Sequence, residues 1–109
     1  MTALPEVIAR YQDAHDLRDT DAALATFTPA ATVRDDGHEY RGTAAIRDWL
    51  SEASVTFTYT RTLVSVANVD ANTWVVTNRL EGDFPGGLVD LHYRYLLEDQ
   101  LIHELDIAP

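Results

Sequence analysis

The sequence contains no cysteine among its 109 residues, which excludes disulfide bonds, thiol catalysis and thiolate metal sites. It also lacks any apolar run close to the roughly 20 residues that a membrane-spanning helix needs. Basic side chains are few, because 8 Lys and Arg stand against 18 Asp and Glu, for a formal net charge of −10. Such a charge repels nucleic-acid phosphates and anionic lipid surfaces. We therefore expect neither nucleic acid nor membrane as a partner.

Other signals of particular function classes are missing as well. The four histidines have no metal-binding spacing, and there is neither a phosphate-cradling glycine loop nor a GxSxG motif, so we expect no metal and no cofactor. The first 15 residues lack the basic-then-apolar order of a signal peptide, which favours a cytoplasmic location. The length and the 46% hydrophobic content are those of a single domain covering residues 1–109.

The first half of the chain has helical periodicity. Apolar residues at intervals of three and four, from Leu4 to His15, predict a helix over about 4–17. Asp19 is a capping residue for a second, short helix over 22–27, which Pro29 ends. Thr43 caps a third helix over about 44–53, whose apolar stripe includes Trp49. The first half is thus mainly helical.

From Val55 onward the apolar residues alternate with polar ones, as in a half-buried strand. This pattern predicts strands over about 55–69, 73–82, 88–97 and 101–107, separated by turns at 69–72, 83–87 and 98–100. Short turns imply antiparallel neighbours. With one early strand before the third helix, the order predicts an α+β domain whose helices pack on one face of a curved antiparallel sheet.

The early strand ATVRDDGHEYRG (31–42) places a carboxylate where the pattern calls for an apolar side chain. Val33 and Asp35 fall on the same face of an extended chain. On an inner face, Asp35 would be poorly hydrated, which raises the pKa of a carboxyl group and suits it to act as a general base. Alternatively, Asp35-Asp36-Gly37 is a turn sequence in which Asp35 holds backbone N–H groups.

The segment ARYQDAHDLRDTDAALATFTPAATVRDDGHEYRGTAAIRDWL (9–50) resembles the N-terminal half of SnoaL-like polyketide cyclases and ketosteroid isomerases. HYRY (92–95) and LIHELDI (101–107) resemble the last hairpin of the same nuclear transport factor 2-like superfamily. The resemblance implies a cone-shaped (cystatin-like) fold with three N-terminal helices on a curved antiparallel sheet. It also implies that Asp35 is the general base and that Tyr11 donates a hydrogen bond to a substrate oxygen.

Tyr11 and His15 lie one turn apart on the apolar face of the first helix and should point inward. The alternative for both is structural, as an amphipathic tyrosine and a satisfied core histidine.

The isomerases need a second, protonated acid, but the alignment places Leu91 at that position, which disfavours steroid isomerisation. Tyr93 and Tyr95 share the face of Leu91, and we predict that Tyr93 points inward while His92 lies on the outer face. His38 and His103 are expected to be exposed.

Asp106 is a further candidate for a second acid or base, because it interrupts the apolar ending Leu105 to Ile107. Alternatively, it is a solvent-facing residue of an alternating strand. Four aromatic residues are predicted to bind substrate. They are Trp49, Phe57, Trp74 and Tyr93. The side chains predicted to be most buried are Leu24, Phe27, Ile46, Trp49 and Phe57.

The first functional hypothesis is therefore a cofactor-independent acid/base cyclase or isomerase acting on a polyketide-like or polycyclic ketone, with a hydrophobic small molecule as its ligand. Two alternatives remain open, namely a non-catalytic dimeric ligand-binding or association module and an epoxide-hydrolase-like enzyme that activates water. An empty pocket holding Tyr11 and Asp35 favours catalysis, whereas a pocket filled by aromatic side chains favours a scaffold. The resemblance, together with Thr56, Thr58, His92 and Arg94 at alternate positions, predicts a homodimer through the outer sheet face.

Overall fold

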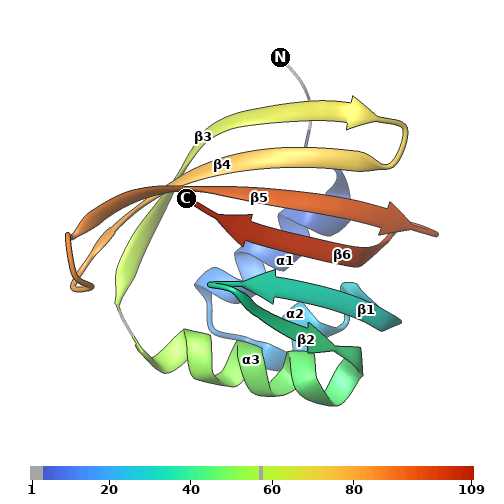
Figure 1. The fold of residues 1–109 in the computed structure, drawn as a ribbon, viewed down its shortest axis with the longest axis horizontal. Helices are drawn as coiled ribbons and strands as arrows, with labels where there is room; N and C mark the ends of the chain where they lie inside the picture. The colour runs from blue at the N-terminus through green and yellow to red at the C-terminus, as the bar shows by residue number, and fades with distance from the viewer. Residues whose placement is uncertain (1–3, 57) are drawn as a thin grey trace.

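The computed structural model describes residues 4–56 and 58–109, without the side chains of 53–56. Three helices and six strands follow one another in this part of the chain (Figure 1). They are α1 (Glu6–Asp16), α2 (Thr20–Leu24), β1 (Phe27–Asp35), β2 (His38–Arg41), α3 (Gly42–Thr56), β3 (Tyr59–Asp70), β4 (Thr73–Gly82), β5 (Leu88–Glu98) and β6 (Leu101–Ala108). The predicted α+β architecture is confirmed.

Each helix begins within two residues of its predicted start, at Glu6, Thr20 and Gly42 instead of about 4, 22 and 44. The Asp19 side chain accepts a hydrogen bond from the Ala22 backbone at 3.1 Å and so caps α2. That helix ends at Leu24, and Phe27 opens β1 instead of closing the helix. The chain leaves the helix early because the carbonyl of Thr26 already accepts a hydrogen bond from the backbone of Ile102, next to the start of β6.

The strand predicted over about 55–69 starts later in the structure. Helix α3 continues to Thr56 and β3 starts at Tyr59, so the alternating residues from Val55 fall partly in the helix. Packing of a helix on a sheet can override the intrinsic strand preference of such residues. Thr56 therefore does not lie on the outer sheet face, and Phe57 lies outside the described residues.

The six strands form one curved sheet in the order β2-β1-β6-β5-β4-β3 (Figure 1). As predicted, β3, β4, β5 and β6 are successive antiparallel neighbours. Two expectations need correction. The early strand is a hairpin of β1 and β2, turned by Asp36 and Gly37 at φ +53° and +77°. The sheet is also not wholly antiparallel, because β1 pairs in parallel with β6.

The core lies between the helices and the inner face of the sheet. Phe27, Ile46 and Trp49 are buried as predicted, while Leu24 is only half-buried at the edge of the core. The most deeply buried side chains come from both layers. They include Ile8 and Tyr11 from α1, Leu50 from α3, and Val33, Val76, Tyr95, Ile102 and Leu105 from the sheet. This packing fixes α1 and α3 against the strands that carry the candidate site.

Candidate active site

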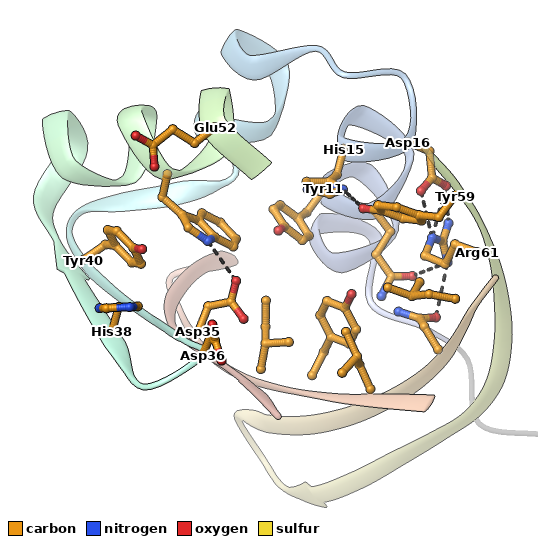
Figure 2. A pocket seen from close by; sticks show the side chains of 17 residues that line it. Tyr11, His15, Asp16, Asp35, Asp36, His38, Tyr40, Glu52, Tyr59 and Arg61 are labelled. Atoms are coloured by element: carbon orange, nitrogen blue, oxygen red, sulfur yellow. Dashed lines mark hydrogen bonds and ion pairs between the residues drawn. The ribbon is translucent and has the colours of Figure 1, made fainter. Parts of the chain in front are cut away.

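A cavity of about 340 Å³ opens between α1, α3 and the inner face of the sheet (Figure 2). Its volume lies within the usual range of small-molecule sites. Five of the residues singled out in the sequence line it. They are Tyr11, His15, Asp35, Trp49 and Tyr93. The cavity therefore brings together, from four separate elements, most of the residues that the sequence suggested for chemistry.

Asp35 is the last residue of β1 and is held in register between His38 of β2 and Ile107 of β6. Its half-buried carboxylate accepts a hydrogen bond from Trp49 Nε1 at 3.1 Å. Burial raises the pKa of Asp35, and the hydrogen bond from Trp49 opposes this increase. The predicted direction of the pKa change is confirmed. Asp36 and Gly37 form the turn that follows Asp35. The segment is therefore a turn sequence, and the Asp35 carboxylate nevertheless faces the cavity.

The side chain that binds Asp35 directly is Trp49 of α3. Among the described residues, its carboxylate is hydrogen-bonded to Trp49, and no hydrogen bond joins it to Tyr11 or His15. Tyr11 and Asp35 instead face the cavity from α1 and from the sheet (Figure 2). Both side chains therefore border the space that a ligand would occupy.

Tyr11 is 2% exposed and packs edge-on against Phe27, with ring centroids 5.4 Å apart. Burial, and secondarily the neighbouring Tyr95, raise the pKa of the Tyr11 hydroxyl. The phenol consequently stays protonated across the physiological range and remains a hydrogen-bond donor. This is the state that stabilisation of a substrate oxyanion requires.

His15 is half-buried on the same helix face and lines the cavity as predicted. Its Nδ1 lies 3.3 Å from the Tyr59 hydroxyl, and its ring stacks on Trp49 with centroids 6.5 Å apart. Burial lowers the pKa of His15, although Asp16 partly opposes this. The imidazole is therefore mainly neutral at pH 7 and can accept or donate a proton.

A polar network that the sequence did not reveal occupies another wall of the cavity. Arg61 of β3 binds both carboxylate oxygens of Asp16, with Nη2 to Oδ2 at 2.6 Å and Nε to Oδ1 at 3.0 Å. Its Nη1 donates to Gln12 Oε1 at 2.9 Å and to Asn78 Oδ1 at 3.4 Å. Gln12 in turn donates to the Tyr95 hydroxyl at 3.2 Å. The sequence contained one sign of this network, because Gln12 and Asp16 are four residues apart and therefore lie on the same face of a helix.

Asp106 does not reach the cavity, which corrects the expectation of a second acid or base there. Its carboxylate accepts a hydrogen bond from Arg34 Nη1 at 2.9 Å on the outer face of the sheet, beside Glu104. Residues alternate along a strand, and Leu105 is buried while Ile107 lines the cavity. Asp106 therefore points outward.

Trp74 is likewise outside the cavity wall, although its strand register places it beside Tyr95 at the edge of the core. Phe57 lies outside the described residues.

Two neighbouring positions of β5 follow the predicted alternation, since Tyr93 is buried and His92 is exposed. The Nδ1 of His92 lies 2.8 Å from the Thr77 hydroxyl. Tyr93 and Trp49 thus remain as aromatic wall residues.

Two histidines were expected to be exposed. His38 is exposed at the rim of the cavity. His103 is half-buried instead, because its Nδ1 lies 2.9 Å from the Thr28 hydroxyl and 3.4 Å from a carboxylate oxygen of Glu98.

Over the described residues, no group of three His, Asp or Glu side chains is arranged to hold a metal ion. Within the same residues, no helix is long and apolar enough to cross a membrane.

Three helices packed on a curved sheet are the arrangement of a class of small α+β proteins with a ketosteroid isomerase-like, nuclear transport factor 2-like fold. The chain belongs to the SnoaL-like domain family, whose profile matches residues 8–102. No curated protein matches the chain significantly.

Three solved structures illustrate the relationship. A candidate polyketide cyclase from Sinorhizobium meliloti is 34% identical, with a TM-score of 0.90 over 96% of this chain and 95% of that one. SalBIII, an epoxide hydrolase/cyclase-like enzyme of pyran ring formation in salinomycin, is 21% identical, with a TM-score of 0.79 over 94% and 86%. A hypothetical protein from Catenulispora acidiphila with a ketosteroid isomerase-like fold, solved with trimethylamine, is 14% identical, with a TM-score of 0.85 over 98% and 87%. The last two show the fold alone.

Proposed function

We propose that the protein is a cofactor-independent acid/base enzyme, a cyclase or isomerase that acts on a polyketide-like or polycyclic ketone. The observation that carries this proposal is the half-buried Asp35 carboxylate, whose pKa is raised, on the wall of a cavity that Tyr11 also lines. The similarity to a candidate polyketide cyclase supports the same class of substrate. An open cavity of this size favours catalysis over a scaffold filled by aromatic side chains.

In the proposed reaction, Asp35 removes a proton from the carbon beside the ketone. The electrons move onto the ketone oxygen, and the resulting enolate accepts a hydrogen bond from the Tyr11 hydroxyl, with Tyr93 as a second donor. The proton then returns to a different carbon in an isomerisation, or the enolate carbon attacks a second carbonyl in a cyclisation. Burial raises the pKa of both tyrosines, so they donate hydrogen bonds without losing their protons.

His15 is the proposed second acid/base group. It is kept neutral by burial and lies beside Tyr59, so it can accept the proton that Asp35 removed from carbon and pass it to a newly formed alkoxide. Leu91 lines the cavity where the ketosteroid isomerases carry a second acid. Steroid isomerisation of that type is therefore not proposed, because the oxyanion would be held by tyrosines alone.

Proton removal can be tested without knowledge of the natural substrate. Cyclic ketones such as 2-tetralone and 1-decalone are incubated with the protein in D₂O, and the loss of α-protons is followed by NMR. We expect Asp35→Asn to slow the enzyme-dependent exchange by about 10²- to 10⁴-fold. Asp90→Asn, which changes an outer-face carboxylate, is the matched control and should retain the wild-type rate. Unchanged exchange in Asp35→Asn would reject Asp35 as the base.

One observation favours water activation as a second candidate. The cavity holds Arg61, which is bound to Asp16, as well as Asp35, and the fold is shared with an epoxide hydrolase/cyclase-like enzyme. In this alternative, Asp35 removes a proton from water, whose oxygen attacks an epoxide carbon while the epoxide C–O bond breaks, and the protonated Asp35 then returns the proton to the released alkoxide oxygen. Incorporation of ¹⁸O from labelled water into a diol, absent in Asp35→Asn, would identify this reaction.

We also propose that the protein is a homodimer joined through the outer face of the sheet. His92 and Arg94 are exposed there on β5. Thr58 lies between α3 and β3, so it does not belong to this face, and neither does Thr56. Two-fold symmetric dimers are the commonest oligomers, which supports the proposal in general terms.

A further inference from the structure

Asn78 contains a buried hydrogen-bond donor that no neighbouring group satisfies. The residue is 0% exposed, and its Nδ2 is the single buried side-chain nitrogen or oxygen without a partner in the described part of the chain. A buried donor left unpaired costs about 1–3 kcal/mol. An unpaired group of this kind in a native structure requires a specific explanation.

The surroundings fix the orientation of the Asn78 amide. Its Oδ1 accepts a hydrogen bond from Arg61 Nη1 at 3.4 Å. A guanidinium has donors only, so a reversed amide would place two donors against each other. Arg61 cannot move away easily, because Asp16 binds it through both carboxylate oxygens and Gln12 accepts from the same Nη1. The unpaired group is therefore the nitrogen of Asn78.

Asn78 lines the same cavity as Asp35 but lies three strands away from it. From β1 the strands run through β6 and β5 to β4, where Asn78 is paired with Leu91. Three strand spacings amount to roughly 14 Å along the sheet, and less across its concave face. Figure 2 shows Arg61, the partner of Asn78, on the opposite side of the cavity from Asp35. A molecule that touched both residues would span the cavity.

The charges around the cavity disfavour an anionic molecule. Four of the lining side chains are acidic, and the single arginine among the lining residues is already bound to one of them. The acidic residues are Asp16, Asp35, Asp36 and Glu52. An anionic group would be repelled here, whereas a carbonyl, ether or hydroxyl oxygen can accept a hydrogen bond without this penalty.

We propose that Asn78 is a second ligand-anchoring residue, whose Nδ2 donates a hydrogen bond to an uncharged oxygen at the end of the ligand remote from Asp35. The assignment of the other end, a ketone beside Tyr11 and Asp35, rests on the proposed function. The substrate class that follows is a polycyclic compound that carries no anionic group and has oxygen atoms at both ends. Ketones with only one oxygen should bind more weakly, because the Asn78 donor then stays unpaired.

Two nearly isosteric ketones test the anchor by isothermal titration calorimetry. 6-Methoxy-2-tetralone carries a remote ether oxygen, and 6-ethyl-2-tetralone has a methylene group in its place. We expect wild-type protein to bind the methoxy compound about 3- to 10-fold more tightly, as one added hydrogen bond implies. Asn78→Leu, which keeps the approximate shape but has no donor, should bind the two compounds equally.

A second variant covers the case in which Asn78→Leu does not fold. Asn78→Asp keeps an acceptor for Arg61 and replaces the Nδ2 donor with a charged carboxylate oxygen, so it too should lose the preference. Thr77→Val, on the outer face of the same strand, is the matched control and should retain it. Equal affinities in the wild type, a preference retained by folded Asn78 variants, or no binding of either ketone would overturn the proposal. Since binding is measured without turnover, this failure is distinct from loss of the proposed base in the exchange assay.

Discussion

Trp49→Phe should raise the pKa of Asp35 further. The indole Nε1 donates to Asp35 Oδ2 at 3.1 Å, and this hydrogen bond opposes the increase in pKa that burial causes. Phenylalanine keeps an aromatic ring in the cavity wall but has no donor. The ionised form of Asp35 therefore loses a favourable interaction, while the desolvation that disfavours this form remains.

The magnitude follows from the geometry. A hydrogen bond to a charged group is worth about 1.5–3 kcal/mol. Asp35 is half-buried, so water can replace part of the lost interaction, which places the effect near the lower limit. Because 1.36 kcal/mol corresponds to one pH unit, the titration midpoint of Asp35 should move up by about one pH unit. If Asp35 is the base, the acid limb of the exchange rate should move with it.

The assay is a carboxylate ¹³C NMR titration of labelled protein, with the Asp35 signal identified by its absence in Asp35→Asn. Trp74→Phe is the matched control, since it makes the same substitution at a half-buried tryptophan outside the cavity wall. It should leave the Asp35 midpoint unchanged. An unchanged or lowered midpoint in folded Trp49→Phe would refute the account of how the Asp35 pKa is set.

Three further predictions concern stability and assembly. Asp35→Asn should raise Tm at pH 7, because the raised pKa of Asp35 means that its ionised form destabilises the fold. This penalty is absent below the unfolded-state pKa and complete above the folded-state pKa, so the gain in Tm should disappear as the pH falls below about 4. Asp16→Asn should lower the free energy of unfolding in urea by about 1–3 kcal/mol, because Arg61 loses a charged partner, whereas Asp90→Asn should cost less, because its ion pair with Arg79 is exposed on the outer face. Light scattering at micromolar concentration should give twice the 12.2 kDa chain mass, and a monomer mass would contradict the dimer.

Local sequence patterns were sufficient to locate the later strands and the orientation of several site residues. The strands predicted over 73–82, 88–97 and 101–107 match β4, β5 and β6 to within one residue, because clear turn sequences separate alternating segments. The same alternation places Tyr93 inward, and helical periodicity places Tyr11 inward. It also explains why Asp106, between two inward-facing apolar residues, points outward instead of acting as a second acid or base.

Features that depend on distant contacts were not predictable from local pattern. The parallel pairing of β1 with β6 and the hairpin strand β2 require the whole sheet to be assembled. The contact between Arg61 and Asp16 joins residues 45 apart, and the Trp49–Asp35 hydrogen bond depends on how α3 crosses β1. Such pairs follow from sheet curvature and helix packing, which neither periodicity nor capping encodes.

The position of β6 in the sheet has a consequence for folding. The last strand lies between β1 and β5 (Figure 1), and the backbone that carries Asp35 is paired with Ile107 near its end. During synthesis, helices α1, α2 and α3 and the β1–β2 hairpin emerge long before this partner exists. The wall that holds the candidate base is therefore completed only after the final strand has left the ribosome. Closure of this long-range pairing should limit the rate of folding, because loop entropy is lost before the native contacts form.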